Sequence, residues 1–229
     1  MRRATLHFLL TTMLPVSRGS SRLRVLCLHG YAQNGAVLRD RSGGFRKPLK
    51  KSRFELHYPD GPFGCTANGE DIATADADAT RRAWWRSMPS QDTYVGWEET
   101  KASLIELWST EHFDGILGFS QGAGAAAMLA AELEPRFAIL ISGFVPRDAS
   151  AGAKLFAGVP ASCPSLHVFG LEDTLVLPER SRALVGCFAN AAVISHTGGH
   201  HIPSGLPVRQ QVVEFLETYG LTNPTSSVA

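Results

Sequence analysis

Short apolar runs alternate with longer amphipathic stretches along most of this chain of 229 residues. The apolar runs have the length of strands and cover residues 23–28, 54–58, 113–119, 137–141, 166–169 and 191–195. Helical patterns lie between and after them, at residues 36–51 (with Pro48 as a local break), 97–110, 123–133, 179–188 and 208–219. Continuous apolar runs that alternate with helices are typical of strands buried in a parallel sheet. The pattern therefore predicts an α/β fold with a mostly parallel central sheet of about six strands and helices on both faces.

The strand and helix pattern begins at residue 23 and ends near residue 220, which predicts one domain over residues 23–220. Residues 1–22 are expected to form an N-terminal extension, and residues 221–229 a frayed polar tail. Two connections are unusually long, at residues 60–96 and 144–163, and both contain aromatic side chains. Long excursions from a compact scaffold are often binding loops, although extra core packing explains them equally well.

Composition excludes several classes of protein. Hydrophobic residues make up 44% of the chain and charged residues 19%, which is enough to build a core and excludes general disorder. The formal net charge of +1 argues against a nucleic-acid binder held by a basic face. No apolar run is long enough to predict a transmembrane helix. The four cysteines are too sparse for a disulfide scaffold and lack the paired spacing of a zinc site.

The N-terminal segment differs from the rest in charge. Residues 1–24 contain five arginines and no acidic residue, together with several serines and threonines. Such a composition resembles an organelle transit peptide, and residues 6–16 also resemble a short secretory signal interrupted by polar residues. An untargeted extension is the third interpretation. We expect a cytoplasmic protein, with a mitochondrial or plastid location as the alternative if residues 1–22 act as a transit peptide.

A candidate nucleophile lies where a strand pattern meets a helical one. Residues 118–122 read Gly-Phe-Ser-Gln-Gly and match the motif G-x-S-x-G around Ser120. A sharp turn from strand to helix needs small residues beside the serine, because side chains there would collide with neighbouring backbone. The turn would expose the Ser120 hydroxyl at the edge of the sheet. The alternative is a serine that only caps a helix.

A serine hydroxyl needs a base to become a nucleophile, and that base needs an acid to orient it. Asp173 follows the fifth predicted strand, and His200 follows the sixth after two glycines. Both lie at the carboxyl ends of strands, where loops can converge on Ser120. Glu172 remains an alternative acid and His201 an alternative base.

The negatively charged oxygen of an acyl-transfer intermediate needs two amide donors. The backbone amide of Gln121, at the predicted start of a helix, is one candidate. The amide of Tyr31, in the loop after the first strand, is the other. We expect Trp84, Trp85 and Phe144 to line an apolar acyl pocket.

Seven sequence segments together resemble the FSH family of serine hydrolases, which belongs to the α/β-hydrolase superfamily. The resemblance spans about residues 23–217, and the segments at 113–123 and 198–203 are the most specific. The other segments lie at residues 25–31, 59–62, 82–85, 141–144 and 170–173. The resemblance implies an α/β-hydrolase fold, Ser120 as nucleophile, Asp173 as acid and His200 as base, without metal or cofactor. His201 departs from the family pattern, in which an apolar or aromatic residue is expected after the base.

These observations predict a serine hydrolase that cleaves carboxylic esters or thioesters of small molecules. An acyltransferase or peptidase that uses the same three residues is the alternative, as is a silent binding module with the same fold. We expect no nucleic-acid partner and no transmembrane segment. The acyl chain length and the oligomeric state do not follow from the sequence.

Overall fold

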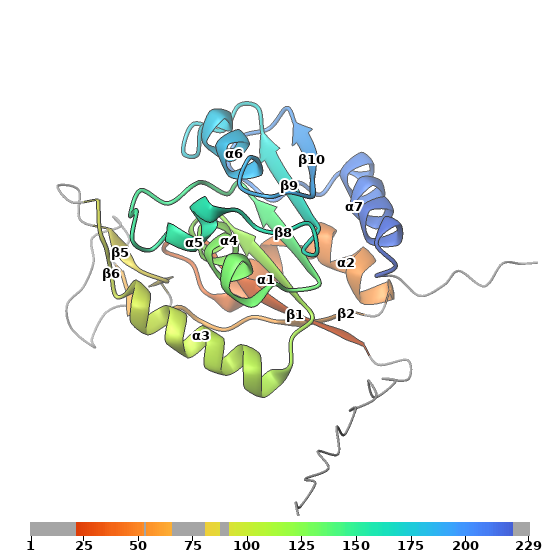
Figure 1. The fold of residues 1–229 in the computed structure, drawn as a ribbon. Coiled ribbons are helices and arrows are strands. Elements are labelled where there is room, and N and C mark those ends of the chain that lie inside the picture. The colour runs from red at the N-terminus through yellow and green to blue at the C-terminus, as the bar shows by residue number, and fades with distance from the viewer. Residues whose placement is uncertain (1–21, 53, 66–80, 88–91, 222–229) are drawn as a thin grey trace, which may run out of the picture.

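The computed structural model describes residues 22–52, 54–65, 81–87 and 92–221 (Figure 1). The expected extension and tail therefore lie almost wholly outside the described residues. Six strands form one sheet in the order β10-β9-β8-β7-β1-β2, and every adjacent pair is parallel. The strands are β1 (Leu23–Leu28), β2 (Phe54–His57), β7 (Gly115–Phe119), β8 (Phe137–Ile141), β9 (Ser165–Gly170) and β10 (Ala191–His196).

Helices cover both faces of this sheet and make three layers (Figure 1). One face carries α1 (Gly35–Arg41), α2 (Gly43–Ser52) and α7 (Leu206–Thr218). The other carries α3 (Trp97–Glu111), α4 (Gln121–Leu133), α5 (Ala153–Ala157) and α6 (Pro178–Val185). Alternate residues of β1 divide between the two cores: Val25 packs with the first set of helices and Leu26 with the second. The fold class predicted from the sequence is confirmed.

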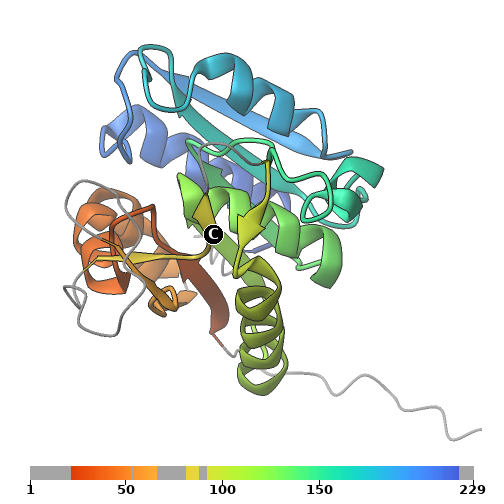
Figure 2. The same ribbon diagram turned by 90° about the vertical axis from the view of Figure 1, so that its left-hand side faces the viewer.

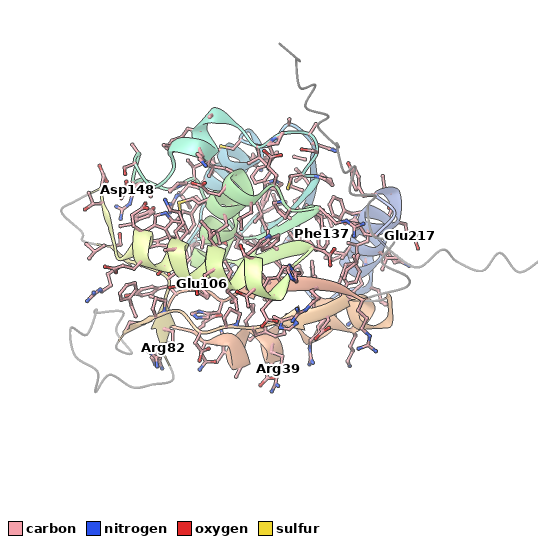
Figure 3. All side chains as sticks on the ribbon, turned by 60° about the horizontal axis from the view of Figure 1, so that its bottom comes forward. Arg39, Arg82, Glu106, Phe137, Asp148 and Glu217 are labelled. Atoms are coloured by element: carbon pink, nitrogen blue, oxygen red, sulfur yellow. The ribbon has the colours of Figure 1, made fainter. Side chains whose placement is uncertain are left out.

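The sheet packs tightly between these layers. A Cβ atom at Gly115 would lie 2.2 Å from the ring of Phe137 on the neighbouring strand, so the strand needs glycine at this position. Phe137 is 0% exposed and lies inside the molecule, whereas Arg39, Glu106 and Glu217 lie at its periphery (Figure 3). No helix of the described ranges is long and apolar enough to cross a membrane.

The connection between β2 and α3 adds two antiparallel ribbons. They pair β3 (Phe63–Gly64) with β4 (Arg82–Ala83), and β5 (Arg86–Ser87) with β6 (Tyr94–Val95). Figure 2 shows the yellow segment that holds β4 to β6 in front of the central sheet. This long excursion thus carries the aromatic residues Trp84 and Trp85 back towards the sheet, where both are buried.

The chain reverses its order of strands at β1. From β1 it moves outward to β2, and it then crosses back to β7 on the other side of β1 before continuing to β10. Loops that leave neighbouring strands at such a switch point diverge to opposite faces, and ligands bind in the crevice between them. The loops after β1 and β7 hold Tyr31 and Ser120.

The predicted break at Pro48 is wrong. The two helices separate at Ser42, whose amide donates to the Leu38 carbonyl and closes α1, whereas Pro48 lies within α2. A proline removes one amide donor from a helix, which weakens it without always ending it. The pattern also missed α5 and the four short strands, because segments of two to five residues are too short to show a period.

Candidate active site

Ser120 occupies the sharp turn between β7 and α4. Its backbone has φ 54° and ψ −119°, a conformation that L-residues rarely adopt. The Ser120 amide donates to the Ile141 carbonyl at 2.9 Å, which ties the turn to β8. The Ser120 carbonyl accepts from the amides of Ala123 and Gly124 at 2.9 and 3.1 Å, which starts α4. The turn is therefore held from both sides, and the Ser120 hydroxyl makes no capping bond to the helix.

The two glycines of the motif allow this turn because the backbone is crowded on both sides of the serine. A Cβ atom at Gly118 would lie 2.2 Å from the Gly122 carbonyl oxygen. A Cβ atom at Gly122 would lie 2.2 Å from the carbonyl oxygen of Leu28 and 2.4 Å from that of His29. The helix thus begins in direct contact with the end of β1, and only glycine fits at either position.

The structure brings Ser120, His200 and Asp173 into one hydrogen-bonded chain. His200 Nε2 lies 3.0 Å from Ser120 Oγ, and His200 Nδ1 lies 2.7 Å from Asp173 Oδ2. The acid follows β9 and the histidine follows β10, two neighbouring strands that end at the same edge of the sheet. The ring of Phe119 supports the imidazole, with ring centroids 5.0 Å apart. In this arrangement a histidine can accept the serine proton through one nitrogen while the other stays bound to the carboxylate.

Backbone bonds hold the acid loop and the histidine loop together. The amide of Leu171 donates to the His196 carbonyl at 2.7 Å, and that of Glu172 donates to the Gly198 carbonyl at 3.2 Å. A Cβ atom at Gly170 would lie 2.1 Å from the Gly198 carbonyl oxygen. The pairing of β9 and β10 therefore continues into both loops, which fixes the two side chains relative to one another.

Asp173 is buried, at 2% exposed, yet its carboxylate is well satisfied. Its Oδ1 accepts from the amides of Leu175 and Val176 at 3.0 and 2.8 Å, and its Oδ2 contacts His200. Burial tends to raise the pKa of Asp173, but the Val176 amide, His200 and the Leu175 amide together outweigh burial, and the pKa is lowered. The group therefore stays ionised and offers His200 a negative partner.

The two alternative residues lie outside this chain of contacts. Glu172 is exposed, and the carboxylate that contacts His200 belongs to Asp173. His201 is exposed as well, and its ring packs against that of His196 with centroids 4.9 Å apart. His196 Nδ1 accepts from the Gly198 amide at 3.1 Å. This pair of histidines therefore stabilises the loop that follows β10.

The two residues expected to supply amide donors line the same cavity as the serine. Tyr31, Ser120 and Gln121 line the same cavity, which has a volume of about 420 Å³. Gln121 is the first residue of α4, and the backbone N–H groups of the first turn of a helix have no carbonyl partner within the helix. Backbone N–H groups beside a nucleophilic serine are the usual donors to the oxygen atom of an acyl-transfer intermediate.

His29 fixes the loop that carries Tyr31. It is 0% exposed, its Nδ1 contacts the Gly30 carbonyl at 2.8 Å, and its Nε2 accepts from the Gly61 amide at 2.9 Å. These two contacts require a neutral ring that is protonated on Nδ1. Burial is the main cause that lowers the pKa of His29 to about 4.

Two of the three residues expected to line the acyl pocket do so, and the third does not. Trp85 and Phe144 line the cavity, with ring centroids 6.5 Å apart. Trp84 does not line it: its ring lies 4.7 Å from that of His29, and its Nε1 donates to the His29 carbonyl at 2.7 Å. The Gln121 side chain holds both tryptophans in place, because its Oε1 accepts from the Trp84 amide and its Nε2 donates to the Trp85 carbonyl, each at 2.9 Å.

Sequence reasoning missed four residues of the cavity wall, namely Ser87, Tyr94, Arg147 and Arg180. Tyr94 stacks on Trp85 with centroids 4.6 Å apart and an interplanar angle of 15°. The signal for Tyr94 was its place among the aromatic residues of a long excursion. Across the described residues, no group of three or more His, Cys, Asp or Glu side chains is arranged to hold a metal ion.

Comparison with known proteins places the chain in a family. A family model described as serine hydrolase (FSH1) matches residues 19–212. The chain belongs to this family. Curated relatives include Esterase OVCA2 from Danio rerio, which is 38% identical over 227 residues, covering 86% of this chain and 97% of the relative. Esterase OVCA2 from Homo sapiens is 34% identical over 221 residues, covering 86% and 96%.

Solved structures agree on the fold of this FSH1-family chain. The acyl-protein thioesterase 2 of Zea mays superposes with a TM-score of 0.62 at 19% identity, covering 88% of this chain and 95% of that one. Likeness at this identity shows the fold, which is that of the α/β hydrolases. Family and fold together make the chain an ester hydrolase of the serine type.

The crowded turn of this family member predicts a sharp difference between two glycines of α4. Gly122→Ala should lower the free energy of unfolding by about 2–3 kcal/mol, because the new methyl group meets rigid backbone. Gly124→Ala is the matched control on the same helix, since its Cβ would lie 3.3 Å from the Trp85 ring, and it should stay within about 1 kcal/mol of wild type. Urea unfolding measures both. Equal stability of the two variants would show that the contact with β1 does not constrain the turn.

The buried neutral His29 predicts an acid-sensitive fold. The pKa of His29 in the folded protein, about 4, lies below the ordinary histidine value of 6.5, so the unfolded chain binds a proton first as pH falls. Stability from this group is complete above pH 6.5 and is lost towards pH 4, by about 3 kcal/mol in total. His29→Gln should therefore flatten the slope of unfolding free energy against pH in this range, whereas His112→Gln, at an exposed site, should not. An unchanged slope in His29→Gln would contradict the assignment.

Proposed function

We propose that this chain hydrolyses carboxylic esters or thioesters through an acyl-enzyme formed on Ser120, with His200 as base and Asp173 as acid. The observation that carries the proposal is the continuous chain of contacts from Ser120 Oγ to His200 at 3.0 Å and from His200 to Asp173 at 2.7 Å. Membership in a serine hydrolase family supports it.

In the first half of the reaction, Ser120 Oγ attacks the carbonyl carbon of the bound ester while His200 Nε2 takes the hydroxyl proton. The carbonyl oxygen becomes negative and accepts bonds from the amides of Gln121 and Tyr31. Collapse of this intermediate breaks the bond to the alcohol or thiol, which leaves with the proton from His200. Water then enters, gives its proton to His200 and attacks the acyl-enzyme, and Ser120 leaves with that proton as the free acid departs.

Asp173 favours the charged form of His200 that appears twice in this cycle. Because the lowered pKa of Asp173 keeps its carboxylate ionised, a negative charge faces Nδ1 whenever the ring is protonated. The carboxylate also fixes the tautomer that leaves Nε2 free to accept the serine proton. Each amide donor of the oxyanion site contributes about 3 kcal/mol of transition-state stabilisation.

The cavity next to Ser120 accommodates a small ester. Trp85, Tyr94 and Phe144 give it aromatic walls, which suit an apolar segment of the acyl group. Trp84 acts behind the wall as a positioning residue, because its indole N–H holds the loop that carries Tyr31. We further propose that residues 23–220 form the catalytic domain.

Labelling with a fluorophosphonate tests the nucleophile, because an activated serine displaces fluoride from this reagent and becomes phosphonylated. Wild-type protein should be labelled on Ser120 and Ser120→Ala should not. His200→Ala should lower kcat for p-nitrophenyl esters by about 10⁴-fold or more. His201→Ala is the matched control at the neighbouring exposed position, and it should keep kcat within about tenfold of wild type. Labelling that persists in Ser120→Ala would overturn the proposal, and loss of activity in His201→Ala alone would reassign the base.

A further inference from the structure

Two arginines share the cavity of the candidate nucleophile. Arg147 lies in the connection after β8 and Arg180 in the first turn of α6, and both line the cavity that also contains Ser120. The mechanism proposed above uses neither of them. A pair of guanidinium groups beside an aromatic acyl pocket is unexpected, because a neutral ester offers no partner for positive charge.

Neutral groups position both guanidinium groups. Arg147 donates from Nη2 to Ser87 Oγ at 2.8 Å, and its backbone amide donates to the Tyr94 hydroxyl at 2.8 Å. Arg180 places Cζ 4.7 Å from the centroid of the Phe144 ring. These contacts orient the two side chains without neutralising them.

Carboxylates near the two arginines in sequence are occupied elsewhere. Asp148, on the side of the molecule that carries β5 and β6 (Figure 3), accepts from the Tyr94 amide at 2.7 Å and from the Ser150 and Ala151 amides at 3.0 Å each. Glu179 pairs with Arg182 at 3.2 Å. Within the described ranges, neither Arg147 nor Arg180 has a carboxylate oxygen within 4.0 Å, whereas Arg24, Arg39, Arg136 and Arg182 each have one.

The positive charges of Arg147 and Arg180 both act on Tyr94 in the cavity wall. Both side chains line the cavity together with Tyr94, whose hydroxyl accepts from the Arg147 backbone amide at 2.8 Å. Burial raises the pKa of Tyr94, and the positive charges of Arg147 and Arg180 both oppose that rise. Tyr94 itself stacks on Trp85 in the cavity wall. The cavity therefore combines a reacting serine, an aromatic wall and a convergent pair of unneutralised cations.

We propose that the preferred substrate is an ester whose acyl chain ends in an anion, a carboxylate or a phosphate, bound by Arg147 and Arg180. The apolar part of the acyl chain would contact Trp85 and Phe144 while its carbonyl carbon lies at Ser120. Guanidinium groups bind both kinds of oxyanion through paired hydrogen bonds. This inference rests on the proposed function, since it names the substrate of the same site.

Matched esters test the proposal. The charged probes are the mono-p-nitrophenyl esters of suberic acid and of 8-phosphonooxyoctanoic acid, and the neutral probe is p-nitrophenyl methyl suberate. Chains of this length avoid the attack of a free carboxylate on its own ester, which accelerates the spontaneous hydrolysis of shorter half-esters. The readout is the ratio of kcat/KM for a charged probe to that for the neutral one. The two charged probes distinguish a carboxylate site from a phosphate site.

We expect a ratio of about ten or more in the wild-type protein, and a fall of about fivefold in each of Arg147→Gln and Arg180→Gln. Arg182→Gln is the matched control on the same helix: Arg182 is exposed, pairs with Glu179 and lies over Phe169 instead of lining the cavity. Its ratio should equal that of wild type. A wild-type ratio of one or less for both charged probes, or equal ratios in all three variants, would overturn the proposal.

A binding measurement separates failure of this inference from failure of the proposed function. Titration calorimetry of Ser120→Ala with monomethyl suberate and with dimethyl suberate measures the anion site without turnover. Binding of the monoanion should be tighter, and the added change Arg147→Gln should reduce the difference about fivefold. Absence of ester hydrolysis in wild type alongside tighter binding of the monoanion would reject the proposed function but keep the anion site. Equal binding of the two esters would reject the anion site.

Discussion

The contact between Gly122 and the carbonyl oxygens at the end of β1 is the constraint on which the site depends. Because a Cβ atom there would lie 2.2 Å from the Leu28 oxygen, α4 can begin close against β1 only with glycine at this position. That closeness brings the Gln121 amide and the loop of Tyr31 to one cavity. Ser120, two residues before Gly122, has an unusual backbone conformation with φ 54°, which the bonds to Ile141, Ala123 and Gly124 maintain.

The rest of the site is assembled by extending the sheet beyond its last paired residues. Strands β9 and β10 continue as paired loops, so the acid and the histidine arrive together with little freedom to separate. Burial of Asp173 opposes its negative charge, but two amides and the imidazole outweigh burial and keep the carboxylate ionised. Gln121 links this machinery to the pocket, because it lines the cavity and its side chain bonds the backbone of Trp84 and Trp85.

Much of the fold followed from the sequence, because buried parallel strands are continuous apolar runs whose limits differ from those of the structure by two residues or fewer. The proximity of Ser120, Asp173 and His200 was also foreseeable, since each follows a strand and all strands end at one edge. The placement of side chains in irregular segments could not be predicted in the same way. Nothing in the sequence distinguished Trp84, which packs on His29, from Trp85, which lines the cavity. Arg147 and Arg180 resembled ordinary surface arginines until tertiary contacts placed them beside Ser120.

The central claim is that a covalent acyl group forms on Ser120 during turnover. Rapid acid quenching of the enzyme while it hydrolyses a p-nitrophenyl ester, followed by peptide mapping with mass spectrometry, tests this claim directly. An added acyl mass is expected on the peptide that contains Ser120, located on that residue by fragmentation. An acyl group found on another residue, such as the partly exposed Cys187, or continued turnover without any acylated peptide, would contradict it.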